Sequence, residues 1–190
     1  MSEKQALRAQ LRRVRNEHEA AIPKTMRALL FMRPPGPLLE LVPNDATIAV
    51  YHPVSSEASP LGYARWFAEQ GHRIALPWFA ARGAPMQFRH WANPFDESEL
   101  TKAPYGGLQP SAEAEEVSVN IAFVPLLGFT AHGQRIGQGG GHYDRYLAEH
   151  PAVIPIGLGW DCQLVESLPV EPHDQPLQAV VTPTRFYGPF

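Results

Sequence analysis

A cluster of glycines beside charged side chains, at residues 135–145, carries the strongest chemical signal in this 190-residue sequence. Four of the five residues at 137–141 are glycines. Because glycine lacks a Cβ and tolerates positive φ, their backbone N–H groups can converge on one anion, and phosphate is the commonest such guest. Residues 142–150 follow with a helical pattern, and the amides at a helix N-terminus also attract anions. The stretch therefore predicts a phosphate-binding loop.

Two charged residues shortly after the glycines suggest what accompanies the phosphate. Asp144 offers the carboxylate oxygens that Mg2+ prefers, and Arg145 places a fixed cation beside it. Plainer roles stay open for both, since Asp144 suits the first turn of a helix and Arg145 could pair with a nearby acid. The sequence thus predicts a magnesium and phosphate site, with a structural role as the alternative.

The spacing of the glycines excludes the two commonest phosphate loops. A Walker A loop needs a lysine directly after its last glycine, and no lysine follows here. A dinucleotide fingerprint starting at Gly137 would need a third glycine where His142 stands. The chain has its own pattern instead: Gly137-x-Gly139-x-Gly141-x-Tyr143-Asp144-Arg145, preceded by Arg135.

The first helix is expected at residues 2–19, where Ser2 and Gln5 form a capping box. Helical spacing places an apolar stripe beside a basic stripe. The helix can dock through its apolar stripe and present cations at the rim of that contact, or the basic side can be an ordinary solvated face. The apolar stripe is Leu7, Leu11, Val14 and His18, and the basic stripe is Lys4, Arg8, Arg12 and Arg15.

A second candidate site lies after the strand expected at residues 47–51. Glu57 stands in the loop that follows this strand, and loops at the carboxyl ends of strands carry the binding groups of α/β folds. We predict Glu57 as a hydrogen-bond acceptor in a pocket, with a solvated surface carboxylate as the alternative. Four aromatic residues could wall a flat organic ligand, although aromatics more often form core: Trp78, Phe79, Phe88 and Trp91.

The remaining pattern alternates strands and helices, which favours an α/β fold with a largely parallel central sheet flanked by helices. We expect one domain over residues 1–190, because this length and apolar content suit a single core. Further strands are expected at 73–76, 86–91, 117–127, 153–160 and 177–182. Helices are expected at 24–32 and 60–70, and a helical turn at 95–100.

Composition narrows the class of partner. The net charge of −3 argues against a protein that coats nucleic acid. The only cysteine, Cys162, cannot form an internal disulfide, and no apolar run approaches the length of a bilayer crossing. Residues 1–19 lack the apolar core of a secretory leader, so we expect a cytoplasmic protein without membrane or nucleic-acid partners.

Residues 135–145 strongly resemble the signature of 5-formyltetrahydrofolate cyclo-ligases, also called methenyltetrahydrofolate synthetases. The resemblance implies a single α/β domain that converts 5-formyltetrahydrofolate into 5,10-methenyltetrahydrofolate and releases ADP and phosphate. Dispersed matches extend it through most of the chain, in this order: Lys4 and Arg8, Tyr51 and Glu57, residues 71–77, Val124-Pro125, Gln163, Leu168-Pro169, His173-Asp174 and residues 180–182.

The resemblance also implies roles for individual residues. It predicts Arg135 and Arg145 as catalytic cations, Asp144 and Asp174 as ligands of Mg2+, and three contacts to the folate, from Glu57, Gln138 and His142. ATP is implied as the co-substrate. The residues expected to bind it are Lys4, Arg8, Arg135, Ile136, Gly137, Gln138, Gly139, Gly140, Gly141, His142 and Tyr143.

Three positions depart from what is frequent in the family. Many relatives have tyrosine in place of His142, tyrosine or arginine in place of Gln138, and glutamate in place of Gln109. Two other functions therefore stay open: a nucleotide- or folate-binding protein without turnover, and an ATP-dependent enzyme for another pterin-like substrate. The retention of Lys4 and of the Asp144-Arg145 pair favours the cyclo-ligase. We expect a monomer, with a dimer as the alternative.

Overall fold

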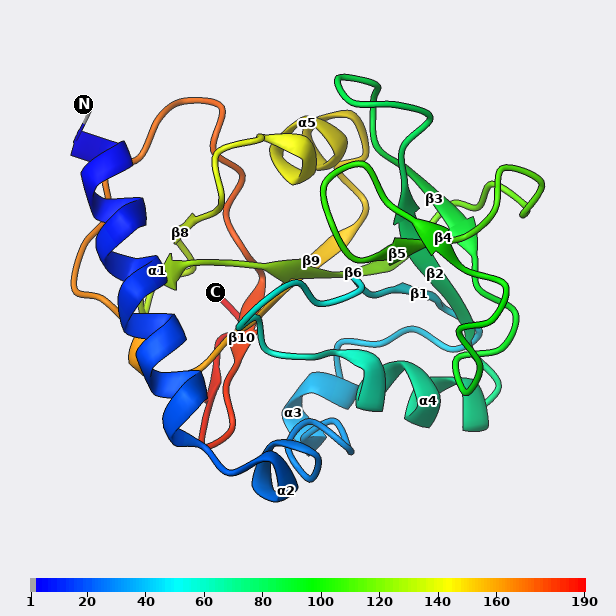
Figure 1. Cartoon of the computed structure of the whole chain (residues 1–190), viewed down its shortest axis with the longest axis horizontal. Coiled ribbons are helices and arrows are strands. Elements are labelled where there is room, and N and C mark those ends of the chain that lie inside the picture. Colours follow the sequence, from blue (N-terminus) through cyan, green and yellow to red (C-terminus); the bar gives the residue numbers. More distant parts are fainter. Residues whose placement is uncertain (1–2) are drawn as a thin grey trace.

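The computed structural model describes residues 3–190, so Ser2 and its expected capping box lie outside the described residues. A seven-stranded sheet forms the centre of the molecule (Figure 1). Its five inner strands run parallel, and the short edge strands β11 and β3 are antiparallel to their neighbours. The order is β11 (Phe186–Tyr187), β10 (Ala179–Val181), β9 (Ile154–Leu158), β6 (Ile121–Pro125), β1 (Thr47–Ala49), β2 (Arg73–Trp78) and β3 (Gln87–His90).

The two faces of the sheet carry side chains of different size. On one face, Ile48, Ile74 and Phe123 join a large buried cluster with α4 (Leu61–Glu69). On the other face, alanines of β1, β2 and β6 pack with Tyr146 and Leu147 of α5 (His142–Glu149). Figure 1 shows α3 (Gly36–Leu39) and α4 on one side of the sheet and α5 on the opposite side. Successive side chains of a strand point to opposite faces of the sheet, so strands that are buried on both faces send apolar side chains into both clusters.

Helix α1 (Glu3–Ala21) stands beside the sheet and is held by its apolar stripe. Leu11 is buried in a cluster with Leu127 of the loop after β6, Ile136 and Leu168, as its helical spacing predicted. Small elements complete the fold: α2 (Lys24–Arg27), a 3-10 turn at Asp161–Gln163, the ribbon of β4 (Thr101–Lys102) with β5 (Leu108–Gln109), and the ribbon of β7 (Gly128–Phe129) with β8 (Arg135–Ile136).

The structure corrects several expected elements. The helix expected at 24–32 ends at Arg27, and residues 28–33 form turns in which Phe31 has a φ of 57°. No helical turn forms at 95–100, because the side chains of Asn93 and Asp96 accept hydrogen bonds from the backbone N–H groups of Phe95 and Ser98. Such bonds compete with helix formation. Helix α3 and strand β11 were not predicted.

The chain reverses its direction of winding at β1. It passes from β1 to β2 on one side and later returns to β6 on the other side of β1. The loops that leave β1 and β6 therefore diverge from adjacent carboxyl ends, which is where open α/β sheets bind ligands. The loop after β1 carries Glu57, and the loop after β6 leads through the β7–β8 ribbon into the glycines. No helix among residues 3–190 has the length and apolar character that a membrane crossing needs.

Candidate active site

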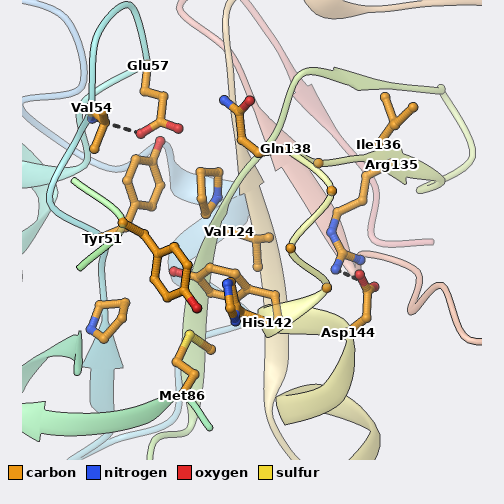
Figure 2. Close-up of a pocket in the computed structure, with 18 of the residues that line it drawn as sticks. Tyr51, Val54, Glu57, Met86, Val124, Arg135, Ile136, Gln138, His142 and Asp144 are labelled. Carbon is orange, nitrogen blue, oxygen red and sulfur yellow. Dashed lines mark hydrogen bonds and ion pairs between the residues drawn. The ribbon is translucent and has the colours of Figure 1, made fainter. Parts of the chain in front are cut away.

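A cavity of about 630 Å³ opens between α1, the loop after β1 and the glycine loop, which we define as residues 137–141 (Figure 2). The sequence-predicted site residues converge on it, except Arg145, which is exposed and lies outside its lining. All four residues of the basic stripe of α1 line the cavity. Arg15 is buried, Lys4 and Arg8 are half-buried, and Arg12 is exposed, so the basic stripe is only partly a solvated face.

The glycine loop has the backbone that its composition predicted. Gly139 and Gly141 have φ values of 104° and 64°, which side chains with a Cβ rarely adopt. Gly141 is the N-cap of α5, and its carbonyl accepts the Arg145 N–H at 3.1 Å. The Arg8 Nε donates to the carbonyl of Gly137 at 3.0 Å, so α1 is tied to the start of the loop.

Among residues 3–190, Arg145 contacts the glycine loop and no acid. Its Nη2 donates to the Gly140 carbonyl at 2.9 Å and lies 3.1 Å from the His142 Nδ1. A Cβ on Gly141 would come within 2.9 Å of the Arg145 guanidinium. The described geometry therefore gives Arg145 the role of bracing the loop.

Arg135 and Asp144 form an ion pair under the loop. The Arg135 Nη2 donates to the Asp144 Oδ1 at 2.6 Å, and only 5% of the Arg135 side chain is exposed. The same oxygen accepts the Gln175 N–H at 3.0 Å, while Arg135 also donates to the Gln175 carbonyl. These bonds join the entry to the glycine loop, the first turn of α5 and the last long loop of the chain.

Lys4 is held by two acids of that last loop. Its Nζ lies 2.9 Å from the Asp174 Oδ2 and 2.9 Å from the Glu171 Oε2. Partial burial works against the ammonium, but the hydrogen bonds and charges of both acids outweigh it and raise the pKa of Lys4. Partial burial likewise opposes ionisation of Asp174, and the Lys4 contact nevertheless holds the pKa of that carboxyl below its usual value. Both groups are therefore charged at neutral pH.

Glu57 lies inside the cavity, and only 10% of its side chain is exposed, so the alternative of a surface carboxylate is wrong. Its Oε2 accepts the Val54 N–H at 2.9 Å, and its Oε1 lies 3.8 Å from the Arg15 Nη1. Arg15 is only 2% exposed and donates through its Nε to the Ser56 hydroxyl at 3.0 Å. A buried carboxylate with a buried cation beside it is suited to recognise neighbouring N–H donors.

Three aromatic rings form part of the cavity wall. The rings of Phe79, Tyr105 and His142 contact one another, with centroids 4.5–4.9 Å apart. Phe79 alone of the four aromatics proposed from sequence lines the cavity. Phe88 and Trp91 are core residues, and Trp78 is covered by the Arg89 guanidinium at 3.9 Å.

Some residues of the site were given no site role at the sequence level. Arg12 and Arg15 line the cavity, and their place on the same basic stripe as Lys4 was a signal that could have assigned them to it. Tyr51, Met86 and Tyr105 also line it, but they come from separate segments without a shared motif. Only the folded chain brings these three together.

Gln109 has a clear structural role. Its buried carboxamide bonds both backbone groups of Phe79: the Oε1 accepts the N–H at 3.1 Å, and the Nε2 donates to the carbonyl at 3.1 Å. A carboxylate could accept the first bond but could not donate the second. The amide therefore fixes the Phe79 backbone at the aromatic wall.

Replacing this amide by a carboxylate in Gln109→Glu should lower the free energy of unfolding by about 1–3 kcal/mol at neutral pH, because the Phe79 carbonyl loses its donor. Urea unfolding of the variant and of Gln10→Glu, an exposed change on α1, measures the difference. The loss should shrink at acid pH, where the introduced carboxyl becomes a donor. Equal stability of the two variants at neutral pH would contradict this role.

The donors present fit a magnesium ion. Asp144 and Asp174 both line the cavity, and hard carboxylate oxygens are the protein ligands that Mg2+ takes beside phosphate oxygens. Glu171, His173 and Asp174 also place potential ligand atoms within 4.8 Å of one another. Asp174 is at present bonded to Lys4, and Asp144 to Arg135 and Gln175.

Comparison with known proteins shows the family. A model described as the 5-formyltetrahydrofolate cyclo-ligase family matches residues 1–183. The chain is 36% identical to the 5-formyltetrahydrofolate cyclo-ligase of Escherichia coli over 149 residues, 74% of this chain and 80% of that protein. It is 29% identical to the 5-formyltetrahydrofolate cyclo-ligase of Mycolicibacterium smegmatis over 185 residues, 94% of each chain.

Solved structures show the same α/β fold. The NMR structure of Aquifex aeolicus 5,10-methenyltetrahydrofolate synthetase superposes with a TM-score of 0.72 at 24% identity, covering 96% of this chain and 93% of that one. A 5,10-methenyltetrahydrofolate synthetase from Mycoplasma pneumoniae gives 0.65 at 20% identity, over 94% of this chain and 98% of that one. As its glycine loop and the matches dispersed through its length predicted, the chain belongs to the 5-formyltetrahydrofolate cyclo-ligase family.

Proposed function

We propose that this chain catalyses the ATP-dependent cyclisation of 5-formyltetrahydrofolate to 5,10-methenyltetrahydrofolate, with release of ADP and phosphate, in the cavity beside α1. The observation that carries the proposal is that the glycine loop, the cations of α1 and the buried Glu57 line the same cavity. One end suits a polyphosphate and the other suits a ring with N–H donors. The activity itself is that of the family to which the chain belongs.

The nucleotide end is assigned to α1 and the glycine loop. Arg8 lies against Gly139 and holds the Gly137 carbonyl, so it is placed to follow the phosphates that the loop amides would bind. Lys4 stands nearby as a second cation. Arg135 would act from beneath the loop by orienting the Asp144 carboxylate, because its guanidinium is committed to that pair.

The folate end is assigned to Glu57 and the aromatic wall. Glu57 would accept hydrogen bonds from N–H groups of the pterin ring, and Phe79, Tyr105 and His142 would contact the flat rings beside it. Tyr143 also lines the cavity, and its hydroxyl is buried without a hydrogen-bond partner among residues 3–190.

The reaction needs the two ends to be aligned. The formyl oxygen attacks the γ-phosphate of ATP, and the bond from that phosphorus to ADP breaks. The neighbouring folate nitrogen then attacks the activated carbon and loses its proton, and phosphate leaves. A formyl oxygen leaves poorly until it is phosphorylated, so the chain's task is to hold it in line and to neutralise charge. The cations of α1 and the loop amides perform the second part.

A bound Mg2+, held by Asp144 and Asp174, would supply further neutralisation of phosphate charge. The carboxylates' own task is to keep their oxygens directed into the cavity. Arg135 and Gln175 hold the Asp144 Oδ1 in place, while Lys4 and the Glu171 N–H hold the Asp174 Oδ2. The cytoplasmic location and the monomeric state stay predictions from the sequence.

A direct assay tests the function. Purified protein is incubated with Mg2+, ATP and 5-formyltetrahydrofolate, and the methenyl product is followed by absorbance while ADP is measured separately. Equal amounts of methenyl product and ADP are expected. Binding of both substrates without product would favour a non-catalytic binding protein, and failure to bind the folate would favour another pterin-like substrate.

Folate binding should weaken at acid pH. Burial raises the pKa of Glu57, and the Val54 N–H, the Arg15 charge and Gln138 offset this only in part. Because only the ionised carboxylate accepts two N–H donors, affinity is present above this raised pKa and is lost as pH falls through it. Titrations of 5-formyltetrahydrofolate across the mildly acidic range should show the loss beginning above the ordinary glutamate range. A pH-independent Kd would contradict the role of Glu57.

A further inference from the structure

The two carboxylates assigned to the metal are each paired with a cation of this chain. The Asp144 Oδ1 accepts the Arg135 Nη2 at 2.6 Å, and the Asp174 Oδ2 accepts the Lys4 Nζ at 2.9 Å. Figure 2 shows the first of these pairs. The backbone N–H of Gln175, the residue after Asp174, also donates to the Asp144 Oδ1, so the two pairs are neighbours. A divalent ion at these acids therefore meets a cation at each of them.

The two cations differ in how firmly they are held. Arg135 is almost fully buried, and its guanidinium donates to the Gln175 carbonyl as well as to Asp144. Lys4 stands in the first turn of α1, and its ammonium reaches Asp174 at the end of a flexible aliphatic stem. Lys4 is therefore the cation that can leave its acid without a change in the fold.

The Lys4 contact uses charge that a divalent ion would need. Its Nζ lies 2.9 Å from the Asp174 Oδ2 and 2.9 Å from the Glu171 Oε2, so one ammonium serves both acids. Only 13% of the Lys4 side chain and 21% of the Asp174 side chain are exposed, and charges in such a place are screened less than on an open surface. A metal ion that arrives alone must displace the ammonium or bind against its repulsion.

A polyphosphate offers the ammonium another partner. Lys4 and Arg8 line the cavity one helical turn apart, and the Arg8 Nε donates to the carbonyl of Gly137, where the glycine loop begins. Phosphate oxygens bound at this loop would compete with Asp174 for the Lys4 ammonium. Asp174 keeps its position without Lys4, because its Oδ2 also accepts the Glu171 N–H at 2.7 Å.

We propose that Lys4 blocks the metal site until the nucleotide arrives: its ammonium holds the Asp174 carboxylate, and the phosphates of the magnesium complex of ATP draw it away. The metal then binds tightly with the nucleotide and only weakly alone. This role rests on the proposed function, because it takes Asp174 as a ligand of Mg2+ and Lys4 as a ligand of ATP. One ammonium thus acts first as a placeholder for the metal and then as a phosphate ligand.

The binding of Mn2+ to the purified chain without nucleotide tests this role. Mn2+ takes the same oxygen ligands as Mg2+, and electron paramagnetic resonance of the free ion gives its Kd. Lys4→Met keeps an unbranched side chain without the ammonium, so it should bind Mn2+ roughly tenfold more tightly than the wild type. Lys4→Arg keeps a cation and should stay near the wild-type Kd. Lys24→Met changes an exposed lysine outside the cavity lining and should have no effect.

Two further measurements locate the ion and exclude general damage. The Mn2+ complex of a non-hydrolysable ATP analogue should bind Lys4→Met more weakly than the wild type, because a phosphate contact is lost. A damaged site would weaken both ligands, whereas this role predicts opposite signs. Adding Asp144→Asn to Lys4→Met should remove the gain for Mn2+ alone, because the ion needs both carboxylates. Unchanged thermal midpoints show that each variant is folded.

The possible failures are distinguishable. Equal or weaker Mn2+ binding to Lys4→Met, or no binding to either chain, overturns the role of Lys4 and leaves the proposed function in place. A gain that survives Asp144→Asn would place the ion on Glu171, His173 and Asp174 alone, and would also overturn it. If the wild-type chain forms no methenyl product, the proposed function fails. The Mn2+ titrations need no turnover and still decide the role of Lys4.

Discussion

Asp144→Asn is expected to lower kcat by at least about 100-fold, since a metal ion at a phosphoryl group contributes several kcal/mol and the variant loses an anionic ligand. The amide oxygen can still accept the Gln175 N–H and a bond from Arg135, so the fold should be retained. Asparagine is for this reason a better probe than alanine, which would leave the Arg135 guanidinium without its partner. Steady-state rates of methenyl formation at several Mg2+ concentrations measure the effect.

Asp45→Asn is the matched control for Asp144→Asn. It makes the same chemical change at an exposed residue with a φ of 58°, a conformation that asparagine tolerates as well as aspartate. Its rate should equal that of the wild type. If Asp144→Asn keeps the parental rate under subsaturating Mg2+, Asp144 is not a metal ligand and its role is confined to holding Arg135 and Gln175.

Glu57→Gln is expected to raise the Kd for 5-formyltetrahydrofolate by about 100-fold. Two hydrogen bonds to a charged acceptor are each worth about 1.5–3 kcal/mol, and a neutral amide also turns one of its own donors toward the ring. The Kd of a non-hydrolysable ATP analogue alone should stay equal to that of the wild type, because Glu57 is assigned to the folate end of the cavity. Calorimetric titration of each ligand separates the two effects.

The same substitution leaves the Arg15 guanidinium buried without its carboxylate, so stability must be measured beside affinity. Arg15 keeps its bond to Ser56, which limits the expected loss. Glu69→Gln, an exposed change at the end of α4, serves as the control for both measurements. An unchanged folate affinity in a folded Glu57→Gln variant would place the pterin elsewhere.

The parts of the fold that follow local rules were predictable from the sequence. The glycine loop and α5 appear within a residue of their expected bounds, because glycine permissiveness and helix signals are local. The parallel sheet followed from alternation of strands and helices. The helix expected at 24–32 was predicted too long, because its length depends on the turn at Phe31. Strand β11 was missed because its two residues carry too little pattern.

The site was predicted in its residues more than in its contacts. The loop after the first strand indicated Glu57, and the resemblance supplied Asp174. Nothing in the order of residues shows that Arg15 stands beside the first or that Lys4 neutralises the second. Those pairs join segments far apart in the chain, so they depend on how α1 docks. Gln109 shows the same limit, since its bonds to the Phe79 backbone become visible only when the β4–β5 ribbon is in place.

The Lys4–Asp174 pair has a consequence for the order in which the molecule matures. The two residues are 170 positions apart, so the walls of the cavity that they join come from α1 and from the loop that carries Asp174. Contacts that close such long loops form late in folding, because chain closure is costly until the sheet between them exists. A folding chain would therefore acquire its substrate affinity late, as a single event.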